Sequence, residues 1–130
     1  MASRKLSDLA PGYAQRFVQW LDACRAQGLD LLVTSTLRTM AEQDALYAIG
    51  RTKPGKRVTN AKAGMSAHNY GLALDFVPIV DGKPEWTGKS AQWQMAGSLA
   101  GSYGLEWAGK WTRFRELAHV QVPGWRSLVQ

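Results

Sequence analysis

The stretch Ser66-Ala-His-Asn-Tyr-Gly-Leu-Ala-Leu-Asp75 carries the clearest structural pattern in this chain of 130 residues. From residue 72 to residue 77 the order Leu-Ala-Leu-Asp-Phe-Val repeats with a period of two, which is typical of a β-strand with one uniformly apolar face. Gly71 permits a turn or a positive φ just before the strand, so His68 can fold back over it. The other face carries Asp75, and an ionised carboxylate in an interior needs a partner.

A metal ion is one candidate partner for Asp75, and a simple hydrogen-bonded pair with His68 is the other. The second and last histidine of the chain, His119, lies in another apolar segment and supplies a third ligand. Two imidazoles and one carboxylate, with water in the fourth position, form a catalytic zinc arrangement. A closed structural zinc site would favour thiolates, and Cys24 is the only cysteine. We therefore expect Zn²⁺ at His68, Asp75 and His119, although manganese or cobalt could substitute.

Two motifs carry a family resemblance. The pattern Ser-x-His-x-x-Gly-x-Ala-x-Asp over residues 66–75, with Glu-x-x-His over residues 116–119, resembles the zinc peptidases that cut bacterial cell-wall peptides. These are the D-alanyl-D-alanine carboxypeptidases, the D-Ala-D-Ala dipeptidases and the L-alanyl-D-glutamate endopeptidases, which include many phage endolysins. The resemblance extends over residues 36–47 and 104–107, and the chain is most similar to the short endopeptidases.

The resemblance implies an α+β fold like that of the hedgehog and D-Ala-D-Ala peptidase group. We expect residues 1–130 to form a single zinc peptidase domain, in which a small, mainly antiparallel sheet carries the metal and helices flank the sheet. No linker or repeat is visible in the sequence. A separate cell-wall-binding domain is therefore not expected.

The resemblance also assigns roles to three further residues. Glu116 is expected to act as the general base, Arg38 to bind substrate and steady the oxyanion, and Ser66 to bind substrate. Each of these residues also has a structural interpretation that needs no catalytic role. Glu116 could be a solvated surface acid, and Arg38 could form a surface salt bridge. Ser66 could simply shape the loop before His68. Side chains three apart point to opposite faces of a regular strand, so a turn must precede a strand over residues 118–122 if Glu116 and His119 face one metal.

Local signals predict the remaining elements. A helical apolar stripe predicts a helix over residues 11–27, with Cys24 as a buried hydrophobe and Gly28 after its end. Thr39 and Glu42 have the spacing of a capping box at the start of a helix. The other expected elements are a strand over residues 29–36, a hairpin turn at residues 81–82 and a helix from residues 87–90 to 104.

The charge balance and the ends of the chain bear on its surroundings. Sixteen basic and ten acidic residues give a formal charge of +6, and residues 51–62 form a basic loop. Such a charge favours polyanionic surroundings, but the loop lacks the interleaved aromatics of a nucleic-acid site. Neither a membrane-spanning run nor a signal peptide is visible. We expect a monomer without stable membrane insertion, made in the cytoplasm and acting on peptidoglycan after release to the periplasm or cell wall.

Three functions fit these features. The first is hydrolysis of the L-alanyl-D-glutamate bond of peptidoglycan stem peptides, as in a phage endolysin that lyses its host. The second is a D-alanyl-D-alanine carboxypeptidase or dipeptidase, which would need a site closed at one end. The third is a zinc-containing binding module without hydrolysis, against which the presence of Glu116 argues.

Overall fold

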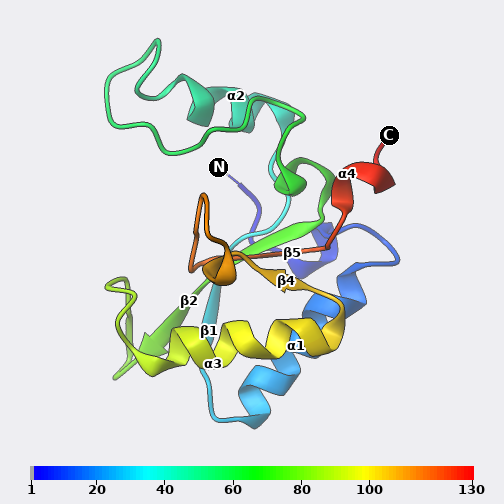
Figure 1. Ribbon diagram of the computed structural model, residues 1–130, viewed down its shortest axis with the longest axis vertical. Helices are drawn as coiled ribbons and strands as arrows, with labels where there is room; N and C mark the ends of the chain where they lie inside the picture. The colour runs from blue at the N-terminus through cyan, green and yellow to red at the C-terminus, as the bar shows by residue number, and fades with distance from the viewer. Residues whose placement is uncertain (1) are drawn as a thin grey trace.

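An antiparallel sheet lies at the centre of the computed structural model, which describes residues 2–130 (Figure 1). The hydrogen-bonded order along the sheet is β1 (Leu31–Ser35), β2 (Ala73–Val80), β5 (His119–Gln121) and β4 (Glu106–Trp107). A short β3 (Lys83–Pro84) pairs with β2 alone and closes the hairpin expected at residues 81–82. All of these strand pairs are antiparallel, as the sequence predicted.

Two helices pack below the sheet, and a third projects above it. The α-helices are α1 (Ala14–Ala26), α2 (Met40–Ala48), α3 (Ala91–Leu99) and α4 (Trp125–Leu128), and the 3₁₀ turns are η1 (Leu6–Asp8), η2 (Ala67–Tyr70), η3 (Ala100–Tyr103) and η4 (Ala108–Lys110). Helices α1 and α3 lie side by side below the sheet, and α2 with the following loop projects above it (Figure 1). The α+β prediction is confirmed.

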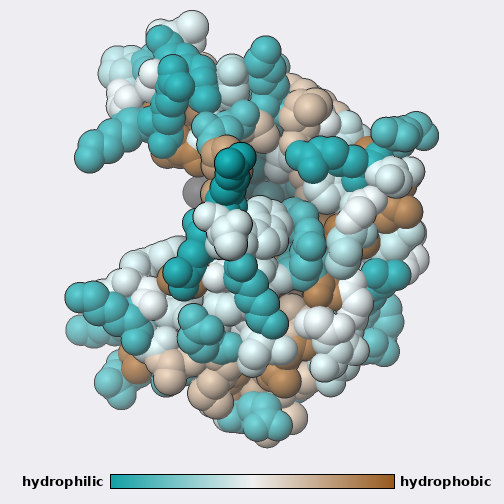
Figure 2. All heavy atoms as spheres, in the orientation of Figure 1, coloured by the Kyte–Doolittle hydropathy of each residue, from teal (hydrophilic) through white to brown (hydrophobic). Residues whose placement is uncertain are grey.

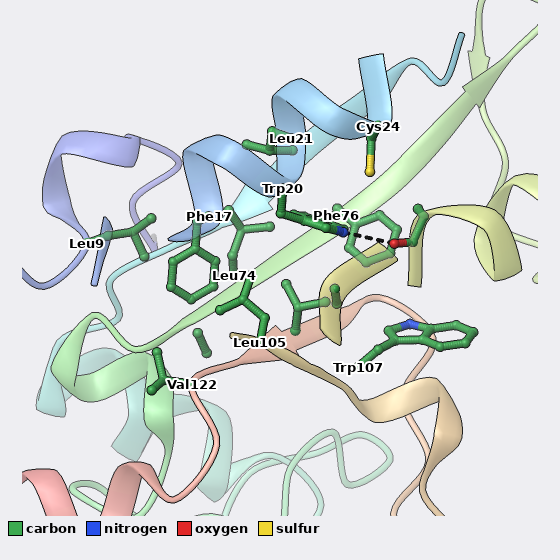
Figure 3. Packing of buried hydrophobic residues seen from close by; sticks show 14 of the residues in the cluster. Leu9, Phe17, Trp20, Leu21, Cys24, Leu74, Phe76, Leu105, Trp107 and Val122 are labelled. Carbon is green, nitrogen blue, oxygen red and sulfur yellow. Dashed lines mark hydrogen bonds between the residues drawn. The ribbon is translucent and has the colours of Figure 1, made fainter. Parts of the chain in front are cut away.

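The core forms between α1, α3 and the central strand β2 (Figure 3). Trp20 of α1 packs edge-on against Phe76 of β2 at a centroid distance of 5.2 Å, and its indole N–H donates to the Ala96 carbonyl of α3 at 2.8 Å. Cys24 is fully buried on the same stripe, as predicted, and burial raises the pKa of its thiol to about 11. The core therefore fixes β2, the strand that carries Asp75.

The local signals for helix starts were correct at both α2 and α3. The Thr39 side chain accepts from the Glu42 N–H, and the Glu42 carboxylate accepts from the Thr39 N–H, which confirms the capping box. Helix α3 begins at Ala91 with Ser90 as its N-cap, at the end of the range expected for its start. The Glu85 carboxylate accepts hydrogen bonds from the Ser90 backbone and the Trp93 indole, so residues 85–90 form a loop around that side chain.

A hollow separates the upper lobe from the body of the molecule (Figure 2). The lobe consists of α2 and the basic loop over residues 51–62, and its surface is predominantly hydrophilic. Within residues 2–130 no helix has both the length and the apolar character needed to cross a membrane. The hollow leads toward the end of β2 that carries Asp75.

Candidate metal centre

His68 is placed by the 3₁₀ turn η2, which precedes β2. The Ser66 hydroxyl caps this turn by accepting from the His68 N–H at 3.3 Å, and the Asn69 side chain accepts from the Ser66 N–H. Gly71 ends the turn at φ +69°, and a Cβ there would lie 2.7 Å from the Ala10 nitrogen. The chain therefore reverses at Gly71, as expected, and His68 returns over the strand.

Asp75 and His119 face each other on paired strands. They are register partners across β2 and β5. The turn expected before β5 is present, because the His119 N–H donates to the Glu116 carbonyl at 3.4 Å. One possible ligand atom from each of His68, Asp75 and His119 lies within 4.8 Å of the others. The structure thus brings together the three side chains predicted as metal ligands.

Hydrogen bonds on the outer side of each imidazole fix its orientation. His68 donates from Nδ1 to the Thr36 carbonyl at 2.7 Å, and that carbonyl can only accept. His119 donates from Nε2 to Gln121 Oε1 at 2.8 Å. The inner atoms, His68 Nε2 and His119 Nδ1, both lie 3.0 Å from Asp75 Oδ1.

This arrangement fits a cation. A neutral histidine that donates from its outer nitrogen directs a lone pair from its inner nitrogen. Two such lone pairs would then converge on the same carboxylate oxygen, which is favourable only when a proton or a metal ion lies among them. Two imidazole nitrogens and one carboxylate oxygen are a donor set of catalytic zinc, and a carbonyl that accepts from the outer N–H is the usual orienting contact of a zinc-bound histidine.

The charges of the centre reinforce one another. Burial raises the pKa of the Asp75 carboxyl, but the adjacent His68 and His119 outweigh burial and hold that pKa well below its usual range. Burial lowers the pKa of His119, yet the hydrogen bond and charge of Asp75 outweigh it and raise the pKa above 6.5. The centre therefore favours a charged carboxylate next to positive charge.

Two predicted catalytic residues lie at the edge of this centre. Glu116 Oε2 is 3.9 Å from His119 Nδ1, and the Glu116 side chain is 59% exposed. Arg38 Nη2 is 3.9 Å from Asp75 Oδ2, and the Arg38 side chain is only 14% exposed. The structure thus places an accessible carboxylate and a largely buried cation beside the same three side chains.

Further contacts hold Arg38 in place. Its Nη1 donates to Gln43 Oε1 at 2.9 Å, and Gln43 is fully buried. The Gln43 amide in turn donates to the Ala61 carbonyl at 2.7 Å, which ties α2 to the loop before η2. Gln43 lies within residues 36–47, over which the resemblance extends, and these contacts supply a physical reason for a glutamine at that position.

Sequence reasoning missed Thr36, Gln121 and Glu106 as parts of the centre. Gln121 follows His119 by two residues on a strand, so period-two patterning alone would place both on one face. No comparable signal exists for Glu106, whose amide partner Gln121 lies on the neighbouring strand. The Thr36 carbonyl follows an irregularity between Val33 and Ser35 in the pairing of β1.

Two cavities meet at Glu116 and His119. One has a volume of about 600 Å³, and Ser66, Lys62 and Phe114 contribute to its lining. The other has a volume of about 590 Å³ and is bordered by Arg38 and by side chains of both the lobe and the body, including Val58 and Trp86. The predicted substrate-binding residues Ser66 and Arg38 therefore line different cavities, and His119 lines both of them.

Comparisons with known proteins agree with this geometry. Residues 59–122 match the family model described as D-alanyl-D-alanine carboxypeptidase. The chain is 39% identical over 125 residues to the peptidoglycan L-alanyl-D-glutamate endopeptidase CwlK of Bacillus subtilis, a match that covers 89% of this chain and 74% of CwlK. It is 28% identical over 118 residues to the L-alanyl-D-glutamate peptidase of Listeria phage A118, covering 90% of this chain but 38% of that relative.

Solved structures share the fold. The L-Ala D-Glu endopeptidase ChiX of Serratia marcescens superimposes with a TM-score of 0.69 at 20% identity, over 98% of this chain and 92% of ChiX. The D,D-pentapeptidase VanY in complex with Zn(II) gives a TM-score of 0.61 at 21% identity, over 89% of this chain and 73% of VanY. The chain therefore belongs to the D-alanyl-D-alanine carboxypeptidase family of zinc peptidases.

Proposed function

We propose that this chain is an endopeptidase that hydrolyses the L-alanyl-D-glutamate bond of peptidoglycan stem peptides. The observation that carries the proposal is the convergence of His68, Asp75 and His119 between two open cavities, with Glu116 at the junction. The names of CwlK and of the Listeria phage peptidase support the same bond. We further propose that residues 1–130 act as one catalytic domain, as a monomer, on peptidoglycan outside the cytoplasm.

The metal ligands in this proposal are His68 Nε2, one Asp75 oxygen and His119 Nδ1. A Zn²⁺ ion held there would polarise the scissile carbonyl and lower the pKa of a bound water to about 7. The Thr36 carbonyl and Gln121 Oε1 hold the two imidazoles with their lone pairs inward. The three ligands come from the turn η2 and the paired strands β2 and β5, and their ligand atoms already lie within 4.8 Å of one another.

Glu116 is the proposed general base. Its carboxylate lies beside His119 at the junction of the cavities, where it can take the proton of the attacking water and pass it to the leaving amine nitrogen. Arg38 presents a fixed cation that stabilises negative charge as it develops on the carbonyl oxygen. Ser66 lies in the first cavity, where its hydroxyl can bind the substrate backbone while it caps η2.

The two cavities favour an endopeptidase over a carboxypeptidase. An endopeptidase must accommodate chain on both sides of the scissile bond, whereas a carboxypeptidase must end its site with a group that binds the terminal carboxylate. Here Glu116 and His119 line both cavities, and the two cavities are similar in volume, about 600 and 590 Å³. A substrate that continues in both directions fits this layout.

One substrate separates the candidate functions. A soluble stem peptide that contains the L-alanyl-D-glutamate bond and ends in D-Ala-D-Ala is incubated with the zinc-loaded chain, and its fragments are identified by mass spectrometry. Cleavage after L-alanine supports the proposal. Release of terminal D-alanine alone supports the carboxypeptidase alternative, and an intact peptide in the presence of bound zinc supports a binding module. The Asp75→Asn variant, with a weakened ligand set, serves as the metal-poor control.

A further inference from the structure

We propose that Gln121 and Glu106 are positioning residues that set the tautomer of His119. In this inference, which rests on the metal centre of the proposed function, they keep the ring proton on Nε2 so that the Nδ1 lone pair faces the metal. Neither residue belongs to the ligand set or to the motifs that identify the family. They act through His119 and do not need to touch the substrate.

The three side chains form a short hydrogen-bonded chain across two strands. His119 and Gln121 share one face of β5, and His119 Nε2 lies 2.8 Å from Gln121 Oε1. The Gln121 amide nitrogen donates to Glu106 Oε1 at 2.6 Å, and Glu106 is the register partner of Gln121 on β4. Gln121 is only 8% exposed, so water offers little competition for these contacts.

Glu106 determines which way the hydrogen bonds run from His119 through Gln121 to Glu106. An amide side chain can present either its oxygen or its nitrogen to a neighbour, whereas an ionised carboxylate can only accept. Glu106 therefore forces Gln121 to donate toward β4 and to turn its oxygen toward His119. That oxygen can only accept, so it holds a proton on Nε2 of His119. Asp75 Oδ1, 3.0 Å from Nδ1, favours a second proton there in the metal-free chain, and a metal ion that replaced this proton would find the Nδ1 lone pair directed toward it.

The two imidazoles are oriented by different means. The ring of His68 is fixed by the Thr36 carbonyl, a main-chain group that every residue type supplies. The ring of His119 is fixed by two side chains, which substitution can change. Without Glu106, the amide of Gln121 could turn its nitrogen toward His119, and the favoured tautomer would then direct an N–H at the metal. The tautomer of His119 therefore depends on the identity of two side chains, Gln121 and Glu106, whereas that of His68 depends on a main-chain carbonyl.

The test measures zinc affinity and the ring proton separately from peptide cleavage. Gln121→Leu removes the acceptor, and we expect it to weaken zinc binding by about 10- to 100-fold, the usual effect of losing an orienting partner. Glu106→Leu leaves Gln121 in place and removes only the group that orients it. The double exchange Glu106→Gln with Gln121→Glu restores the direction of the hydrogen bonds. The new amide at position 106 donates to the new carboxylate at position 121, and that carboxylate accepts from His119 Nε2–H.

Two readouts are needed. Chelator competition gives the zinc dissociation constant, and nitrogen NMR of the chain at saturating zinc shows which nitrogen of His119 binds the metal and which carries the proton. We expect Nε2–H in the wild type and in the double exchange, with zinc affinity retained, and a tautomer mixture with weakened affinity in Gln121→Leu and Glu106→Leu. The exposed Gln94 of α3 provides the matched control, since Gln94→Leu should change neither readout.

Three results would overturn the inference. These are an unchanged tautomer and affinity in Glu106→Leu, the same in a folded Gln121→Leu, or a double exchange that binds zinc as poorly as Gln121→Leu. Failure of the proposed function would look different, because a wild type that binds zinc with Nε2–H on His119 yet leaves stem peptides intact would refute the peptidase activity alone.

Discussion

At the scale of single residues, Asp75 is the point on which the centre converges. One of its oxygens lies 3.0 Å from both His68 Nε2 and His119 Nδ1, and the other lies 3.9 Å from Arg38. Asp75 thus contacts both histidines and lies close to the largely buried cation of Arg38. By contrast, Glu116 is accessible, and its removal leaves the ligand set intact.

Glu116→Gln should separate chemistry from metal binding. The amide retains the shape of the side chain but cannot accept a proton, so we expect kcat to fall by about 10²- to 10⁴-fold. Zinc content and Tm should stay at wild-type values, because the side chain is 59% exposed and is not a proposed ligand. Stem-peptide kinetics with metal analysis of the same samples would check this. A variant that stays within tenfold of wild type would remove Glu116 from the mechanism.

The protonation of His119 should make the effect of zinc on stability depend on pH. In the metal-free chain the pKa of His119 lies above its ordinary value of 6.5, with Asp75 as the main stabilising partner. Its contribution to stability is therefore complete below about pH 6.5 and is lost as pH rises through the folded-state pKa. Zinc needs the deprotonated ring, so the gain from zinc should grow over the same range.

Thermal unfolding with zinc and with a chelator, at a series of pH values from about 6 to 8.5, measures this gain. The Tm of the metal-free chain should fall across the series, and the difference between the two curves should widen. A difference that does not change with pH would show that proton and metal do not compete at His119. Asp75 does not complicate the result, because its lowered pKa keeps it ionised throughout the range.

At the scale of elements, Trp107 connects α3 to the segment that carries Glu116. Its ring packs directly on Gly97 of α3 and on Gly109, where added Cβ atoms would lie 2.0 and 2.2 Å from ring carbons. Its indole N–H donates to the Leu117 carbonyl at 2.7 Å. A displacement of this ring would therefore be passed to the turn between Glu116 and His119.

Gly97→Ala should destabilise the protein despite lying within a helix. Alanine favours the helix by up to about 1 kcal/mol over glycine, but overpacking costs about 1–3 kcal/mol, and a 2.0 Å contact with a buried ring places this site toward the upper end. Urea unfolding should show the loss, together with a lower kcat. Gly101→Ala is the matched control, because nothing lies within 4 Å of its Cβ position. Equal stability of the two variants would contradict this packing argument.

Features encoded over a few residues were predictable from the sequence, and features encoded by strand pairing were not. The Thr39 capping box, the reversal at Gly71 and the turn before β5 each depend on neighbours within about one turn of chain, and all are present. The contact of Glu106 with Gln121 depends on the register of β4 with β5, and the contact of Thr36 with His68 depends on how the turn η2 packs beside the end of β1. A single sequence specifies neither arrangement.

At the scale of the whole molecule, positive charge is concentrated near the hollow. Residues 51–62 contribute five of the sixteen basic side chains and no acidic one, and they form part of the lobe above the body (Figure 2). The net charge of +6 would attract an anionic surface over a distance limited by salt. This attraction affects binding to an insoluble polymer more than the chemistry at the metal.

Clearing of cell-wall suspensions should therefore slow as salt is raised, whereas cleavage of a small soluble stem peptide should change little. The Debye length falls from about 8 Å at physiological ionic strength to about 3 Å at 1 M, which screens most of the attraction. Rates on both substrates across a salt series provide the measurement. If both rates fall in parallel, the basic residues act within the active site rather than on the approach to the wall.

The two cavities that meet at Glu116 and His119 have a mechanical consequence under the proposed function. A site open in both directions needs no free end, so every exposed stem peptide in a cross-linked network can be cut. Cuts then accumulate throughout the peptidoglycan network in proportion to its exposed area. An enzyme that needs a free peptide end would instead shorten the stem peptides from their termini. Under turgor a network cut throughout would fail by tearing once enough neighbouring strands had lost their tension.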